Sequence, residues 1–179
     1  MILEQPDISI NPKTHKVMAW LSPSFPLGAF AYSHGLEFEI SEGNVSTSKE
    51  LYEWLKDILR FGSVWNDLVL FCNSYKTDVD SLNELSDIAK AFAQSKERYY
   101  ETIEMGNAFS KIISSIEGVY LKGMPLPIIM GYIAKIENVS LSYILPLYAH
   151  SFISNLISVS IRLLPLGQTD AQKLLFSLF

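Results

Sequence analysis

Apolar positions recur along this chain at the spacing of helices. Residues 46–62 place leucine, tryptophan and isoleucine on one face, which is typical of an amphipathic helix. Thr47 and Glu50 have the spacing of a capping box at its start, and Gly62 is placed to end it. The pattern continues on one side of residues 63–76, so we expect two consecutive helices joined at Gly62.

The middle of the chain predicts two further helices. Ser81 and Glu84 repeat the capping pattern before an apolar stripe that includes Phe92. In the next helix, Gly106 costs about 1 kcal/mol relative to alanine, which favours a close helix crossing at that point. An acidic edge of the same helix is expected to be solvated; it consists of Glu97, Glu101 and Glu104.

Three more helical segments follow, at residues 123–138, 140–164 and 168–179. The first opens with prolines, and the second is expected to be interrupted or started at Pro146. No sustained alternation of apolar and polar residues indicates a sheet. The sequence therefore predicts an all-α, single-domain helical bundle of roughly eight to ten helices over residues 18–179, after a loose N-terminal arm at residues 1–17.

The segment from Asn138 to Ile161 also satisfies the length of a membrane span, because no side chain in it is formally charged when His150 is neutral. Seven polar residues interrupt the apolar run from Leu141 to Ile161, and several of them share one face. A central helix surrounded by other helices explains this pattern best. A membrane-associated helical protein remains the alternative.

Charge and cysteine content narrow the class of protein. The chain carries 14 basic and 19 acidic residues, a net charge of −5, so it lacks the positive face that nucleic acids require. Cys72 is the only cysteine, which excludes a disulfide framework and fits a reducing cytoplasm. Apolar residues make up 49%, so part of the surface is expected to face a partner.

The stretch "LSPSFPLGAFAYSHGLE", residues 21–37, holds the most distinctive candidate chemistry. Ser33 and His34 suggest a nucleophile and its base, and a small serine hydrolase is the enzymatic alternative. Adjacent helical residues point about 100° apart, however, and no strand-to-helix elbow surrounds them. The three histidines are too scattered to form a recognisable metal-ligand set.

A second stretch, "RLLPLGQTDAQ", lies at residues 162–172. Arg162 suits the carboxyl end of the preceding helix, and Gly167 permits a turn after it. Gln168 and Gln172 then begin another helix with groups that both donate and accept hydrogen bonds, which suits holding a loop or a partner backbone.

These two stretches resemble the UreF-type urease accessory proteins, and so do "GNVSTSKELYEWLKDILRFG" and "SKERYYETIEMGNAF" between them. The four stretches occur in the same order as in that family, and the resemblance covers the chain from about Met18 to Gln172. The resemblance implies an all-helical, cytoplasmic protein without enzymatic activity or a cofactor of its own. It implies a complex with the scaffold protein UreD, also called UreH, and recruitment of the GTPase UreG. Nickel, the cargo of that complex, would then reach the urease apoprotein, and the accessory protein would also pair with itself.

The resemblance also suggests partner-binding residues. Pro26 and Gly28 are expected to turn the chain into a helix beginning near Ala29. The first block, residues 21–37, is expected to lie on or near the surface offered to the GTPase. The alternative is that its aromatic residues belong to the core. The residues carried on the first turns of that helix would be Phe30, Tyr32, Ser33, His34 and Glu37. In the second block, Arg162, Gly167, Gln168 and Gln172 are expected to serve architecture and self-pairing as much as direct contact.

One departure from the family concerns the carboxyl end. Family members usually continue to a segment with a His-Glu pair and a terminal arginine motif that contributes to partner binding. This chain stops at "LLFSLF" and is expected to lack that tail. Its last helix would then leave an uncovered apolar stripe made of Leu174, Leu175, Phe176, Leu178 and Phe179.

Overall fold

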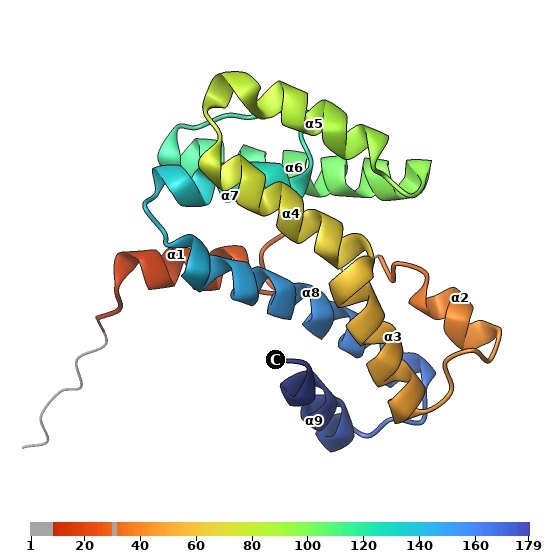
Figure 1. Cartoon of the computed structure of the whole chain (residues 1–179). Coiled ribbons are helices and arrows are strands. Elements are labelled where there is room, and N and C mark those ends of the chain that lie inside the picture. Colours follow the sequence, from red (N-terminus) through yellow and green to blue (C-terminus); the bar gives the residue numbers. More distant parts are fainter. Residues whose placement is uncertain (1–8, 30–31) are drawn as a thin grey trace, which may run out of the picture.

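A computed structural model describes residues 9–29 and 32–179, and within these residues the regular structure is entirely helical (Figure 1). The predicted all-α class is confirmed. The helices are α1 (Pro12–Trp20), α2 (Leu36–Ser41), α3 (Ser48–Phe61), α4 (Ser63–Lys76), α5 (Leu82–Ala91), α6 (Lys96–Glu117), α7 (Leu126–Ile136), α8 (Leu141–Leu163) and α9 (Gln168–Leu178), with a short 3₁₀ helix at Val79–Ser81.

Helices α3 and α4 follow the prediction closely. The hydroxyl of Thr47 accepts a hydrogen bond from the Glu50 amide, and the Glu50 carboxylate accepts one from the Thr47 amide, so the capping box is formed. Gly62 has an extended backbone between the two helices and ends the first of them. The break redirects the chain without a loop, because the next helix starts at Ser63.

Three expectations about the N-terminal arm and α5 are wrong. Part of the expected N-terminal arm is helix α1, where the Asn11 side chain caps the first turn and Val17 is buried. Ser81 makes no side-chain cap bond because its own backbone is already helical, at φ −94° and ψ 0°. Phe92 lies beyond the end of α5 and is 71% exposed instead of continuing the buried stripe.

The core divides into two clusters of buried apolar side chains. One lies among α1, α5, α6, α7 and neighbouring parts of α4 and α8, and the other among α2, α3, α9 and the remaining parts of α4 and α8. Figure 1 shows α4 and α8 running between the two ends of the molecule. Leu68 of α4 packs against both clusters, so these two helices tie the ends together.

Helix α8 is long and apolar enough to cross a membrane by length and composition, with a mean hydropathy of 1.4 over its best window. It contributes Ile144 and Tyr148 to one cluster and Ile153 and Leu156 to the other, and all four side chains are buried. Its position in the core accounts for its apolar character. Pro146 lies within the helix and neither interrupts nor starts it.

Two glycines allow backbones to approach closely. A β-carbon at Gly106 would lie 2.1 Å from the carbonyl oxygen of Met124, at the segment leading into α7. A β-carbon at Gly131 of α7 would lie 2.6 Å from the carbonyl oxygen of Phe71 in α4. The close crossing predicted at Gly106 is therefore confirmed, and α7 is held between α4 and α6 at distances that only glycine permits.

We predict that Gly106→Ala lowers the free energy of unfolding by about 2 kcal/mol or more, because the added methyl group meets backbone that cannot rotate away. Urea denaturation followed by circular dichroism measures this loss. Gly167→Ala is the control, since its nearest non-neighbouring atom would lie 3.9 Å away and we expect a change below about 1 kcal/mol. Equal losses in the two variants would contradict the close crossing.

Candidate functional site

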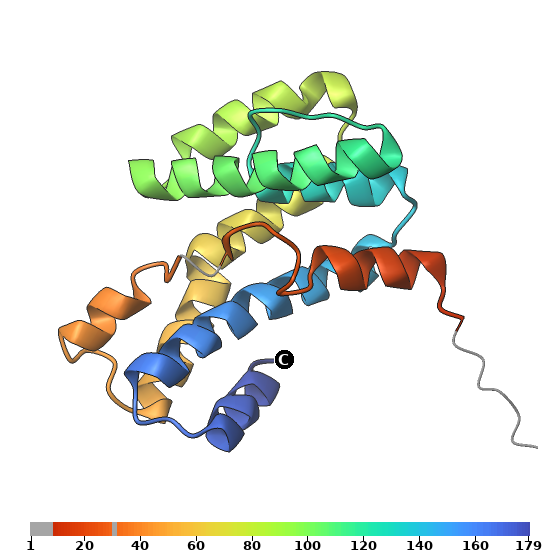
Figure 2. The same ribbon diagram turned by 180° about the vertical axis from the view of Figure 1, so that it is seen from behind.

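Residues 21–29, which follow α1, run between α6 and α8 (Figure 2). The hydroxyl of Ser151 in α8 donates a hydrogen bond of 3.1 Å to the carbonyl oxygen of Leu21. The ring of Phe25 lies 5.6 Å from that of Phe109 in α6, measured between centroids. These contacts fasten a largely irregular segment to two core helices.

The helix expected near Ala29 begins only at Leu36. His34 and Gly35 both have positive φ, at 54° and 90°, and that backbone cannot continue a right-handed helix. Ser33 therefore lies in the segment before α2, and among the described residues of this block that were expected to bind a partner only Glu37 is on the helix. The expectation for Phe30 lies outside the described residues.

The residues of the first block separate into an exposed group and an inward group. Pro26, Gly28 and Glu37 are exposed. Tyr32 packs against the first core cluster, as the alternative of a core aromatic residue expected, and Ser33 is half-buried. The His34 side chain is only 8% exposed, so it faces the interior.

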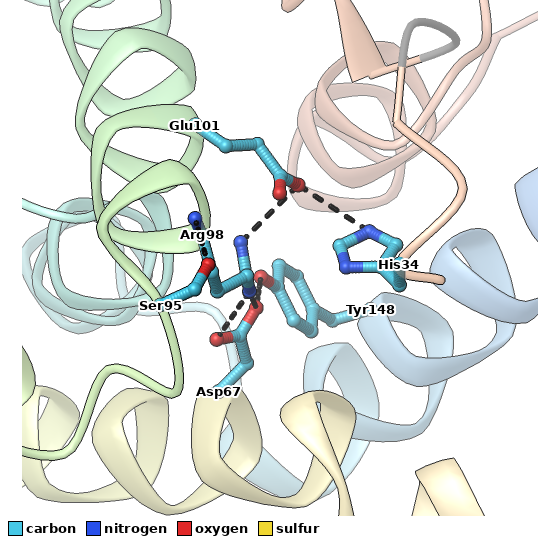
Figure 3. A network of polar contacts seen from close by, with 6 residues as sticks. All are labelled: His34, Asp67, Ser95, Arg98, Glu101 and Tyr148. Carbon is cyan, nitrogen blue, oxygen red and sulfur yellow. Dashed lines mark hydrogen bonds and ion pairs between the residues drawn. The ribbon is translucent and has the colours of Figure 1, made fainter. Parts of the chain in front are cut away.

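The interior around His34 holds a network of charged and polar side chains (Figure 3). Arg98 of α6 donates from one guanidinium nitrogen to both carboxylate oxygens of Asp67 in α4, at 2.8 and 2.7 Å. The hydroxyl of Tyr148 in α8 donates to Asp67 at 3.1 Å. Through these bonds α4, α6 and α8 meet at the Asp67 carboxylate. Ser95 caps the start of α6 by accepting a hydrogen bond of 3.1 Å from the Arg98 amide.

Glu101 extends this network to the segment before α2. Its Oε1 lies 3.2 Å from Nη1 of Arg98 and 3.3 Å from Nε2 of His34. The His34 ring also lies 4.4 Å from that of Phe152 in α8. The expectation of a solvated acidic edge is wrong for Glu101, which is 6% exposed, whereas Glu97 and Glu104 are exposed.

Burial governs the protonation of these groups. It lowers the pKa of His34 to about 3, with the nearby Arg98 charge adding to the effect, so this imidazole is neutral at physiological pH. Burial also raises the pKa of Glu101 to about 7, although Arg98 opposes the rise. Burial raises the pKa of Tyr148 well above its ordinary value, which keeps its hydroxyl available as a donor to Asp67.

The geometry does not provide the serine–histidine pair of a hydrolase. Nε2 of His34 faces Glu101, and Nδ1 has no hydrogen-bond partner in the part of the chain that the structure describes. Ser33 is therefore not hydrogen-bonded to the imidazole that would have to activate it. Within residues 9–29 and 32–179, no group of three or more histidine, cysteine, aspartate or glutamate side chains gathers as metal ligands.

An open groove of about 710 Å³ lies beside the network. Its walls come from residues 32–35, the carboxyl half of α3 and the start of α6. His34, Arg98 and Glu101 line this groove and also belong to the buried network. The network thus fixes the position of one groove wall, and we take the groove as the candidate functional site.

The second block lies at the junction of α8 and α9. Arg162, Gly167, Gln168 and Gln172 are all exposed there. None of them lines the groove, although Leu36 beside Glu37 shares a core cluster with Ala171 of α9. The two blocks are therefore supported by one cluster but present separate surfaces.

The apolar stripe of the last helix is only partly uncovered. Leu174 and Leu175 are buried against the second cluster, where α9 contacts α3 and α8, and Leu178 is partly buried there. Phe176 is 81% exposed and Phe179 is 57% exposed.

Sequence reasoning missed Arg98 and Tyr148 as members of the site. A weak signal existed for their partner, because Asp67 interrupts the apolar run of α4 and a buried carboxylate requires a donor. Which cation would pair with it depends on how α6 crosses α4, and that crossing has no signature in the sequence.

We predict that replacing Glu101 with glutamine removes a pH dependence of stability. The folded-state pKa of about 7 lies above the ordinary 4.5, so the glutamate contribution is complete at low pH and is lost as pH rises from about 4.5 to 7. Between pH 5 and pH 8, wild type should lose on the order of 2 kcal/mol more than Glu101→Gln in urea denaturation. Parallel stability profiles would show that Glu101 is not forced to ionise in a buried position.

Comparison with known sequences gives the family. A sequence model of the UreF family matches residues 45–179.

Three of the similar proteins that carry the name urease accessory protein UreF illustrate the relationship. The one from Roseobacter denitrificans is 42% identical over 159 residues, covering 89% of this chain and 72% of the relative. One from Cereibacter sphaeroides is 44% identical over 162 residues, covering 90% and 76%. One from Mesorhizobium japonicum is 39% identical over 166 residues, covering 89% and 74%. The chain therefore belongs to the UreF family.

Proposed function

We propose that this chain is a non-enzymatic adaptor in urease maturation. Large aromatic side chains at the surface of a closed helical fold carry the proposal. Phe61 is 76% exposed, Phe92 is 71% exposed and Phe176 is 81% exposed. Aromatic side chains are enriched at protein interfaces, so each of these exposed rings is a candidate contact with a partner.

The buried network supports a binding role over a catalytic one. Arg98 is held by Asp67 and Glu101, and His34 is kept neutral in contact with Glu101. Each charged group is thus occupied with another group of the network, which holds helices and the segment before α2 in place. Such an arrangement shapes a surface instead of activating a nucleophile.

The partners in this proposal are the scaffold protein UreD, also called UreH, and the GTPase UreG. The adaptor recruits the GTPase and modulates it, and nickel passes as cargo to the urease apoprotein. GTP hydrolysis belongs to the GTPase, and the complex works in the cytoplasm. The exposed residues Pro26, Gly28 and Glu37 belong to the face offered to the GTPase.

Self-association is a further part of the proposal. Arg162, Gly167, Gln168 and Gln172 are exposed at the junction of α8 and α9, and Phe176 of α9 and the following Phe179 are exposed as well. Polar groups beside exposed aromatic side chains resemble the rim and core of a protein interface. We assign this surface to pairing between two copies of the chain.

Co-purification with the scaffold protein and the GTPase tests the proposal. We predict that Glu37→Lys lowers the amount of GTPase captured at least fivefold, because it reverses the charge of an exposed residue on the offered face. Glu42→Lys makes the same charge change at the exposed end of the same short helix and should leave capture unchanged.

Circular dichroism of both variants should match wild type, since neither side chain is buried. Equal capture by both variants would contradict the assignment of this face. Failure of the wild-type chain to form a complex with either partner would overturn the adaptor function itself.

A further inference from the structure

The groove beside the network combines aromatic walls with acidic groups. Trp54 and Phe61 of α3 line it, and the exposed carboxylates of Asp57 and Glu97 stand at the same surface. Its volume of about 710 Å³ lies within the range of about 300–1,000 Å³ that is typical of ligand pockets. Aromatic faces and carboxylates together are the two kinds of group that attract an organic cation.

The inner end of the groove contains buried polar atoms that lack hydrogen-bond partners. Nδ1 of His34 is buried and has no hydrogen-bond partner among the described residues. Nη1 of Arg98 and Oε1 of Glu101 also make no hydrogen bond of good geometry, but they lie 3.2 Å apart as an ion pair. The side chains of His34 and Glu101 are 8% and 6% exposed, and both line the groove. A donor that reaches Nδ1 of His34 therefore gains a hydrogen bond that the described part of the chain does not supply.

The charges that line the groove leave it acidic. The guanidinium of Arg98 is offset by Asp67, to which it donates two hydrogen bonds. Hydrogen bonds at the start of α6 lower the pKa of Glu97, so this carboxylate is ionised at neutral pH. No lysine is among the described residues that line the groove.

The lysines of α3 and α6 nearest to the groove carboxylates contact other side chains. Lys56 pairs with Glu53 at 2.7 Å, and Lys96 lies over the ring of Tyr100 at 5.6 Å from its centroid. The carboxylates of the groove are therefore left without cationic partners from these two positions.

We propose that this groove binds an arginine side chain presented by a partner protein. A guanidinium stacks on aromatic faces, is weakly hydrated and offers five donors, whereas an ammonium is compact and strongly hydrated. Its plane lies against Trp54 or Phe61, and its N–H groups reach the carboxylates of the groove and Nδ1 of His34 at the inner end. The inference rests on the proposed adaptor function for the source of the arginine.

The test uses a small probe, so that it does not depend on any particular partner. The full chain is titrated with the peptide acetyl-Gly-Arg-Gly-amide, and the indole N–H signals of the tryptophans are followed by NMR. We expect a saturable shift at Trp54. Trp65, which is exposed outside the groove, and the buried Trp20 should not shift.

Matched peptides and variants isolate the charge and the shape of the probe. The peptide with citrulline, the neutral isostere of arginine, should give no saturable shift, and the lysine peptide should bind at least threefold more weakly. Asp57→Asn combined with Glu97→Gln should raise the dissociation constant of the arginine peptide at least fivefold. Glu84→Gln, which removes an exposed carboxylate of α5 outside the groove, should leave it unchanged.

Any of four results overturns the proposal. They are absence of a saturable shift at Trp54, equal binding of the citrulline peptide, equal binding of the lysine peptide, and unchanged binding by the double variant. A chain that still co-purifies with the GTPase while failing this titration keeps the adaptor function and loses only the arginine site.

Discussion

The buried pair of Arg98 and Asp67 is the interaction on which the site depends. A guanidinium and a carboxylate are costly to bury singly, and they become tolerable only when each satisfies the other. Here one carboxylate accepts from Arg98 and from Tyr148, so α4, α6 and α8 are joined at one point. Glu101 then carries the connection to His34 and fixes the segment that precedes α2.

This arrangement explains how a UreF-family chain can present a defined surface without regular structure at that place. The segment before α2 has positive φ values at His34 and Gly35, and the backbone hydrogen bonds of its described residues are those of isolated turns. Its position comes from side chains: His34 against Glu101 and Phe152, and Phe25 against Phe109. The aromatic and acidic groove lies where this segment meets α3 and α6.

Much of the fold could be predicted from the sequence because its signals are local. The capping box of Thr47 and Glu50, the stop at Gly62 and the close approach at Gly106 each act within a few residues or through a missing side chain. The site could not be predicted in the same way. The sequence pattern places Glu101 on an exposed helix edge, and only the packing of α6 against α4 buries it. The helix expected near Ala29 does not form because His34 and Gly35 have positive φ, for which the sequence contains no recognisable motif.

The most direct measurement is the free energy of unfolding of Asp67→Asn in urea, compared with Asp170→Asn, which removes the carboxylate from an exposed pair with Lys173. We predict a loss on the order of 3 kcal/mol for Asp67→Asn, because the buried Arg98 then lacks the carboxylate that accepts both hydrogen bonds of its Nη2. We predict a loss below about 1 kcal/mol for Asp170→Asn. Similar small losses in both variants would contradict the claim that this buried pair holds the site together.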